Sequence, residues 1–205
     1  MHHDVPALSH DEIHVWRMAW SGTVEPPFAS LLAAYAGPDA PAVVRGEHGK
    51  PLFPAPWNTL GFSWSHSRDT ALFAVGRGGA GFELGVDVER VRPRPKALEL
   101  AGRFFAPDET SMLNELAPEA VLPAFLALWT AKEAVLKAHG GGLSYGLHRV
   151  AFSLVDNLAR PSCFDGDVAP ASAWQVRPLS LGEDTVGALA WRGAERRIRV
   201  FTSPL

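Results

Sequence analysis

The sequence predicts an α+β fold, and three observations support this. Alternation of apolar and polar residues, which is typical of half-buried strands, occurs in both halves of the 205-residue chain. A long helical pattern at residues 119–139 lies between these strand-rich stretches and ends at three consecutive glycines. The 47% hydrophobic content is enough for a sizeable core. No residue-level repeat relates the two halves, so the pattern alone does not indicate a duplication.

In the first half, five segments have strand character, and two of them form a hairpin pattern around residues 67–69. A short helix is expected at residues 28–35, because Gly37 and Pro38 follow it and end the helical pattern. The strands are expected at residues 12–20, 43–45, 60–66, 70–75 and 82–90.

In the second half, helices precede strands. Residues 96–103 have a helical pattern, and the run from Pro107 to Glu109 is typical of a helix start, where the helix dipole favours acids. Residues 161–171 combine two prolines with Asp-Gly-Asp, which predicts an exposed loop. The strands are expected at residues 146–155, 173–178, 185–191 and 197–202.

The composition argues against several classes of function. A net charge of −3 and a pI of about 6.2 disfavour nucleic acid or an anionic membrane as the main partner. The single cysteine, Cys163, excludes an internal disulfide and favours a reducing compartment. Residues 1–6 show no signal-peptide pattern, and no apolar run reaches the roughly 18 residues of a membrane span. We therefore expect a cytoplasmic protein.

Charged residues lie where the long helix should be apolar. Steps of three and four residues place Lys132 and Glu133 on the same face as Trp129 and the apolar residues before it. Lys137 follows Glu133 by four residues and lies at the edge of that face. Burying an unpaired charge is costly, so these side chains need a metal, a phosphate or each other as partners. The alternative is an ordinary solvated Glu–Lys pair.

The strand at residues 82–90 carries two acids on one face. Asp87 and Glu89 are two residues apart, so they point the same way at a spacing of about 7 Å. Neighbouring carboxylates repel each other, which raises a pKa or recruits a cation. Mg²⁺ is typically bound by one or two carboxylates together with substrate phosphates. The alternative is a solvent-facing acidic edge.

These segments and two others resemble motifs of the 4′-phosphopantetheinyl transferases. Residues 85–89 are similar to G-[IV]-D-[IVL]-E, and residues 129–143 are similar to W-x-x-K-E-A-x-x-K-x-x-G-x-G-L. Gly-Lys-Pro at residues 49–51 also matches, as does Phe-Ser-Trp-Ser-His-Ser at residues 62–67, with Ser63 in place of an Asn. The matched motifs run from about residue 45 to residue 145. Four ordered motifs make the resemblance specific, and the flanking strands fit the larger class, which activates peptide and polyketide synthetases.

The resemblance implies two similar α+β halves in a pseudo-two-fold arrangement, with the active site in the cleft between them. The halves are expected at residues 1–105, which carry the strand of Asp87 and Glu89, and at residues 106–205, which carry the helix of Glu133 and Lys137. Larger members have an Arg-rich helical stretch before the Gly-Lys-Pro turn. Residues 20–44 contain neither Arg nor Lys, so the first half of this chain is abbreviated.

The implied reaction moves the phosphopantetheine arm of coenzyme A onto a serine of an apo acyl or peptidyl carrier protein. Asp87, Glu89 and Glu133 are then the expected Mg²⁺ ligands. Glu133 and Lys137 are the expected catalytic residues, the first for the serine proton and the second for the leaving phosphate. The expected coenzyme A contacts are Arg45, Lys50, Ser65, His66 and Lys137.

A Ser-His hydrolase is excluded, because Ser65 and His66 are neighbours on a strand and point to opposite faces. Two other functions stay open: a different Mg²⁺-dependent enzyme acting on a diphosphate nucleotide, and a non-catalytic protein that binds carriers. A monomer is expected. Residues 103–112 are a candidate docking segment for the carrier, since they mix large apolar side chains with few charges. The same pattern is equally typical of a core.

Overall fold

The structure is a computed structural model that describes residues 5–22 and 28–202. Residues 1–4, where the absence of a signal peptide was predicted, lie outside the described part, as do residues 23–27 and 203–205. The described helices are α1 (Ala29–Ala36), α2 (Ala97–Phe104), α3 (Pro107–Asn114) and α4 (Pro118–His139). The strands are β1 (Glu12–Ala19), β2 (Val44–Arg45), β3 (Pro51–Leu52), β4 (Leu60–Ser67), β5 (Thr70–Arg77), β6 (Leu84–Arg90), β7 (Val150–Val155), β8 (Leu158–Phe164), β9 (Trp174–Ser180), β10 (Thr185–Arg192) and β11 (Arg197–Thr202).

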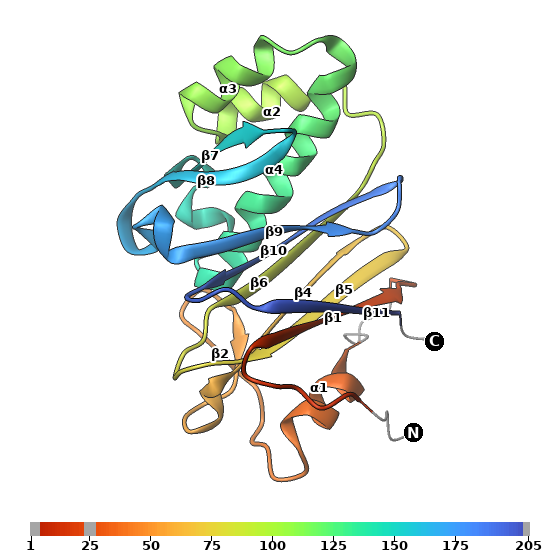
Figure 1. Cartoon of the computed structure of the whole chain (residues 1–205), viewed down its shortest axis with the longest axis vertical. Coiled ribbons are helices and arrows are strands. Elements are labelled where there is room, and N and C mark those ends of the chain that lie inside the picture. The colour runs from red at the N-terminus through yellow and green to blue at the C-terminus, as the bar shows by residue number, and fades with distance from the viewer. Residues whose placement is uncertain (1–4, 23–27, 203–205) are drawn as a thin grey trace.

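The predicted α+β class is confirmed, and the layers follow from the alternation along the strands. A four-stranded sheet has the order β11-β1-β5-β4, and a three-stranded sheet has the order β6-β10-β9. One apolar core lies between the two sheets, where inward residues such as Val15, Leu72 and Val86 meet. α1 packs on the outer face of the first sheet, and α4 packs on β6 and β10 of the second (Figure 1).

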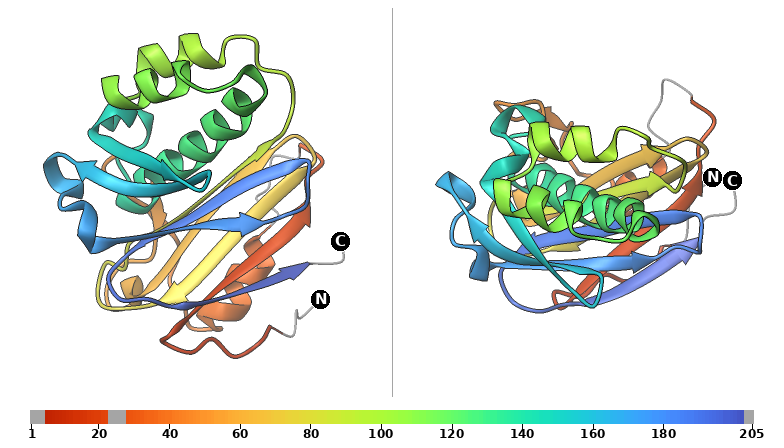
Figure 2. Two further views of the ribbon diagram at one scale, coloured as in Figure 1. Left: turned by 45° about the horizontal axis from the view of Figure 1, so that its top comes forward. Right: turned by 90° about the horizontal axis from the view of Figure 1, so that it is seen from above.

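Each sheet contains strands from both expected halves of the chain. β11, near the C-terminal end, pairs in parallel with β1, and β6, from the first half, pairs antiparallel with β10. Figure 2 shows these strands running side by side in two further views. The sheets thus do not divide at residue 105. The division of the chain there and the pseudo-two-fold relation stay predictions.

The two sheets meet along β4 and β6, where serine hydroxyls take the place of a backbone ladder. The Oγ atom of Ser63 accepts the amide N–H of Val86 at 3.1 Å, and the Oγ atom of Ser67 accepts that of Arg90 at 3.1 Å. Ser65 lies between these two serines and turns its hydroxyl to an acid of β6. Alternate residues of a strand share one face, so a row of every second residue forms this seam.

Helix α4 lies directly on the backbone of β6 at Gly85. A methyl carbon on Gly85 would overlap the carbonyl oxygen of Ala134 and the amide nitrogen of Ala138. Glycine therefore allows a closer approach of helix to strand than any other residue. α4 ends at His139, and the residue that caps it, Gly140, has a φ of 95° in the left-handed region that favours glycine. No helix in the described part of the chain combines the length and the hydropathy that a membrane span requires.

Most predicted elements lie within two residues of the observed ones, but two predictions were wrong. Residues 161–164 belong to β8 and not to a loop; Pro161 is tolerated because it lies beside a register shift in the β7–β8 pair, where a ladder bond is already interrupted. The predicted strand at residues 146–155 begins only at Val150; Leu147–Arg149 form a 3₁₀ turn, and Gly146 precedes that turn. The short strand β3 was not predicted at all.

Replacing Gly85 with Ala should lower the free energy of unfolding by about 3 kcal/mol or more, because helix and strand must separate to admit the methyl group. Urea unfolding followed by circular dichroism measures the effect. Gly79→Ala is the control, since its methyl group would meet no atom within 4 Å, and it should change stability by less than about 0.5 kcal/mol. Equal stability of both variants would contradict the close packing at Gly85.

Candidate active site

The centre of the candidate site is Asp87, a buried acid in the middle of β6. One carboxylate oxygen, Oδ1, accepts hydrogen bonds from the Ser65 hydroxyl and the Lys137 ammonium, each at 2.7 Å. The other oxygen, Oδ2, is buried and has no hydrogen-bond partner among the described residues. Burial raises the pKa of Asp87, and Lys137 and Ser65 counteract part of that rise. The site therefore holds one acid with a free, buried oxygen.

Glu133 lies on α4, one helical turn before Lys137, which contacts Asp87. Its side chain is buried, and within residues 5–22 and 28–202 the carboxylate has no ion pair. Burial, followed by the charge of Asp87, raises the pKa of Glu133 to about 7, while Lys137 lowers it. Two carboxylates that share a buried site repel each other unless a cation lies between them. Together with the free Asp87 oxygen, they are suited to a divalent cation.

Glu89, the third expected metal ligand, has other partners. Its Oε2 atom accepts a hydrogen bond from Arg94 at 2.6 Å and another from the Ser67 hydroxyl at 3.0 Å. In the described ranges, no three His, Cys, Asp or Glu side chains come together as a metal site. The structure thus brings Asp87 and Glu133 together, and it places Glu89 in an ion pair. A ligand role for Glu89 stays a prediction.

Ser65 and His66 lie on opposite faces of β4, as the strand geometry predicts. The Ser65 hydroxyl is buried and also accepts a hydrogen bond from Lys137 at 2.8 Å. The exposed ring of His66 lies against Trp20 and Trp64, with ring centroids 4.8 and 5.4 Å away. Burial of part of this ring, followed by the charge of Lys137, lowers the pKa of His66. The two residues therefore share no proton, and their expected contacts with coenzyme A stay predictions.

Lys50 lies at the end of α4 and binds protein carbonyls. Its ammonium donates to the carbonyl oxygens of Leu84, at 3.2 Å, and of Ala138. Burial lowers the pKa of Lys50 to about 8, although Glu83 opposes this. Because the last carbonyls of a helix have no partner within the helix, Lys50 caps α4 and ties it to β6. This structural role was not predicted.

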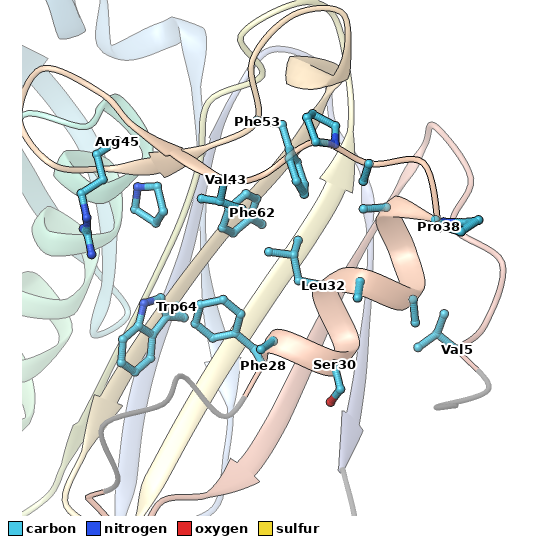
Figure 3. Close-up of a pocket in the computed structure, with 18 residues that line it drawn as sticks. Val5, Phe28, Ser30, Leu32, Pro38, Val43, Arg45, Phe53, Phe62 and Trp64 are labelled. Atoms are coloured by element: carbon cyan, nitrogen blue, oxygen red, sulfur yellow. The ribbon is translucent and has the colours of Figure 1, made fainter. Parts of the chain in front are cut away.

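Two hollows adjoin the site, and Pro51, Phe62 and Trp64 line both of them. The smaller one, of about 180 Å³, is lined by His48, Lys50 and Lys137 among others. The larger one, of about 1250 Å³, lies between α1 and β4. Figure 3 shows Arg45 and Trp64 at one end of it and Val5 at the other. Neither His48 nor Trp64 was predicted as a site residue, although Trp64 lies within the matched motif at residues 62–67.

Arg45 is exposed on the wall of the larger hollow. Its guanidinium donates only to the carbonyl of Gly49, at 3.0 Å, in the described part of the chain. It is therefore available to an anionic group of a ligand, and its contact with coenzyme A stays a prediction.

Lys132 has no exposed surface, and it is paired away from the site. Its ammonium contacts Glu109 at 2.6 Å and donates to the carbonyls of Leu147, at 3.0 Å, and Val150, at 2.6 Å. Burial lowers the pKa of Lys132 to about 8, and Glu109 opposes the shift. The sequence indicated that Lys132 needs a partner, but it did not identify Glu109. Lys132 therefore joins α4 to α3.

The candidate docking segment at residues 103–112 is largely core. Phe105 is buried and stacks on Phe125 with a centroid distance of 5.4 Å. Phe104 and Met112 are partly buried and pack against the same core. The structure therefore favours the core interpretation for the aromatic part of this segment.

Comparisons with known proteins place the chain in a family. The profile of a family described as the 4′-phosphopantetheinyl transferase superfamily matches residues 83–190, just over half of the chain. The match includes Asp87, Glu133 and Lys137, and it begins after Lys50 and His66.

Individual relatives were found as well. The 4′-phosphopantetheinyl transferase AcpT of Salmonella typhi is 41% identical over 146 residues, which is 71% of this chain and 73% of AcpT. The 4′-phosphopantetheinyl transferase HetI of Nostoc is 32% identical over 169 residues, 80% of this chain and 67% of HetI. A Synechocystis relative is 42% identical over 120 residues, 56% of this chain and 45% of the relative. The matched part therefore spans less than half the length of that relative.

Glu109→Gln should lower the free energy of unfolding by about 3 kcal/mol, because the buried Lys132 loses its counter-ion and must either stay charged without a partner or give up its proton to remain buried. Urea unfolding measures this. Glu99→Gln removes an exposed partner of Lys96 and serves as the control, with an expected change below about 0.5 kcal/mol. A loss no greater than in the control would show that the buried pair contributes nothing.

Lys50→Met should lower the free energy of unfolding by about 1–2 kcal/mol, because the terminal carbonyl of Ala138 loses its donor. Lys96→Met, at an exposed position, controls for the loss of a charge. If Lys50 acted only as a phosphate clamp, its replacement would weaken ligand binding and leave unfolding unchanged, so thermal unfolding without ligand distinguishes the two roles.

Proposed function

The chain belongs to the 4′-phosphopantetheinyl transferase superfamily, and we propose that it transfers the 4′-phosphopantetheine arm of coenzyme A to a serine of an apo carrier protein, releasing 3′,5′-ADP. The observation that supports this best is the meeting of Asp87 from β6 with Glu133 and Lys137 from α4. These groups are far apart in the sequence, and two of them are carboxylates buried beside a cation.

Mg²⁺ fits the free oxygen of Asp87 and the carboxylate of Glu133. When bound, the metal ion supplies positive charge that neutralises the diphosphate of coenzyme A. Carboxylate ligands and a phosphate are the combination that Mg²⁺ favours. The site offers these two acids without a competing ion pair to Glu133 among the described residues.

In the proposed reaction, the carrier serine oxygen forms a bond to the β-phosphorus of coenzyme A, and the bond from that phosphorus to the bridging diphosphate oxygen breaks. Glu133 accepts or orients the serine proton. Lys137 holds positive charge beside the leaving phosphate and donates a hydrogen bond to it. The Ser65 hydroxyl supports this arrangement by binding both Asp87 and Lys137.

Coenzyme A binds, in this proposal, along the two hollows that share Trp64. His48, Lys50 and Lys137 give the smaller hollow a basic lining with no acid, which suits phosphates. The larger, mostly apolar hollow has Arg45 at its rim and accepts the nucleoside end. The basic residues compensate for the absence of Arg and Lys from residues 20–44.

The partner is an apo acyl or peptidyl carrier protein. We propose a monomer, because β6 and α4 of one chain supply both sides of the site. We place the reaction in the cytoplasm, since Cys163 is exposed and has no second cysteine with which to pair. Mass spectrometry of an apo carrier domain after incubation with the protein, coenzyme A and Mg²⁺ distinguishes transfer from other nucleotide chemistry and from simple carrier binding.

Glu133→Gln and Asp87→Asn should each reduce the transfer rate by about 100-fold or more, because each removes one of the two charges that suit the metal ion. The fold should survive, since both changes preserve shape. Transfer to an apo carrier, with circular dichroism in parallel, measures this. Glu99→Gln is the exposed control. A wild-type rate in Glu133→Gln would falsify the proposed metal-dependent transfer.

A further inference from the structure

His14 is a buried histidine outside the candidate active site. It lies on β1, its side chain has no exposed surface, and its Nδ1 atom is 2.7 Å from the hydroxyl oxygen of Tyr35 on α1. Its Nε2 atom lies 3.3 Å from a carboxylate oxygen of Glu12. The indole N–H of Trp16 donates to the same Tyr35 oxygen at 3.0 Å. These four side chains, which we call the His14 network, join the strand to the helix.

The His14 network admits one distribution of protons. Glu12 stays ionised: burial raises the pKa of this acid, but hydrogen bonds and two nearby arginines bring it below its ordinary value. A carboxylate only accepts, so the proton of a neutral His14 ring lies on Nε2. Nδ1 is then an acceptor, and Tyr35 donates its hydroxyl proton to it while accepting from Trp16. The hydroxyl and both ring nitrogens thus have partners while His14 is neutral.

A second proton on the His14 ring would leave a hydroxyl without a partner. Both nitrogens of an imidazolium donate, so the Tyr35 oxygen would have to accept from His14 and from Trp16 together. Burial raises the pKa of Tyr35, so the hydroxyl keeps its own proton, which has no other acceptor among the residues that the structure describes. A buried donor without a partner costs free energy comparable to a lost hydrogen bond.

The charge of that proton would not be balanced either. Glu12 already pairs with Arg197 at 2.8 Å and lies 3.9 Å from Arg199, both on β11. On β5 the residue opposite His14 is Val75, and the sequence of α1 contains no charged residue. Burial lowers the pKa of His14, Glu12 opposes that shift, and Arg199 adds to it. The folded protein therefore favours the neutral ring.

Helix α1 depends on such contacts with the sheet. Its eight residues are too few for a stable isolated helix, and no side chain caps its N-terminus. Besides the hydroxyl of Tyr35, the carbonyl oxygen of that residue is bound, by Arg77 of β5 at 3.0 Å. α1 also forms a wall of the larger hollow, where Ser30 and Leu32 lie (Figure 3). Releasing Tyr35 would therefore move that wall.

We propose that the His14 network is a pH-sensitive switch: α1 stays docked on the first sheet while His14 is neutral, and one added proton releases the helix and opens the larger hollow. The direction follows from the favoured neutral ring. Docking is complete above the ordinary histidine pKa of about 6.5 and is lost as the pH falls below it. The switch needs neither the metal ion nor the transfer reaction, so it can be tested without them.

Hydrogen exchange of the full-length protein without ligands, followed by mass spectrometry and corrected for the intrinsic exchange rate, tests the switch. Between about pH 7.5 and about pH 5.5, the protection of residues 29–36 should fall about fivefold or more in the wild type, since one proton changes an equilibrium by up to about tenfold per pH unit. His14→Gln keeps a hydrogen-bonding side chain that does not titrate, so its protection should be the same at both pH values. His10→Gln removes an exposed histidine and should behave as the wild type does.

Equal protection of residues 29–36 at both pH values in the wild type would overturn the proposal. A fall in His14→Gln as large as in the wild type would overturn it too, because another group would then be titrating. Should His14→Gln fail to fold, nitrogen NMR of the His14 ring in the wild type decides the question. A neutral ring with its proton on Nε2 and a titration midpoint that coincides with the loss of protection is expected, whereas a neutral ring with its proton on Nδ1 would contradict the switch.

Discussion

The approach of α4 to the backbone of β6 at Gly85 is the contact on which the site depends. With a side chain there, the helix would have to lift away from the strand, and Glu133 and Lys137 would move with it. Asp87, two residues after Gly85 on the same strand, is buried, and burial raises its pKa while the neighbouring charge of Lys137 opposes the rise. Lys50 strengthens the contact by joining the last turn of α4 to the start of β6.

The serine seam gives the second constraint. The Oγ atoms of Ser63 and Ser67 accept backbone N–H groups of β6. The hydroxyls of Ser65 and Ser67 donate to Asp87 and Glu89 and so orient the two acids. The short side chain of serine thus serves both the packing of the sheets and the placement of two acids.

Periodicity predicted most helices and strands, because their apolar faces are buried in the expected way. It predicted that Lys132 and Glu133 must find partners, but distances between residues remote in sequence are not encoded in spacing. The contact of Lys132 with Glu109, of Glu89 with Arg94 and of Lys50 with Ala138 could therefore only be seen in the structure. The grouping of Asp87 with Glu133 and Lys137 was predicted from the motif resemblance and not from a physical pattern. The strand β8 was missed because Pro161 is a residue type that is common in loops.

The exchange of strands between the sheets has a consequence for synthesis on the ribosome. A chain emerges from its N-terminal end first. β1 meets its parallel neighbour β11 only after residues 197–202 have emerged, and β6 waits for β10 at residues 185–192. The strand that carries Asp87 thus has an unpaired edge from its own synthesis until residues 185–192 have followed, when it is open to wrong partners. Neither sheet can be completed by one half of the chain alone.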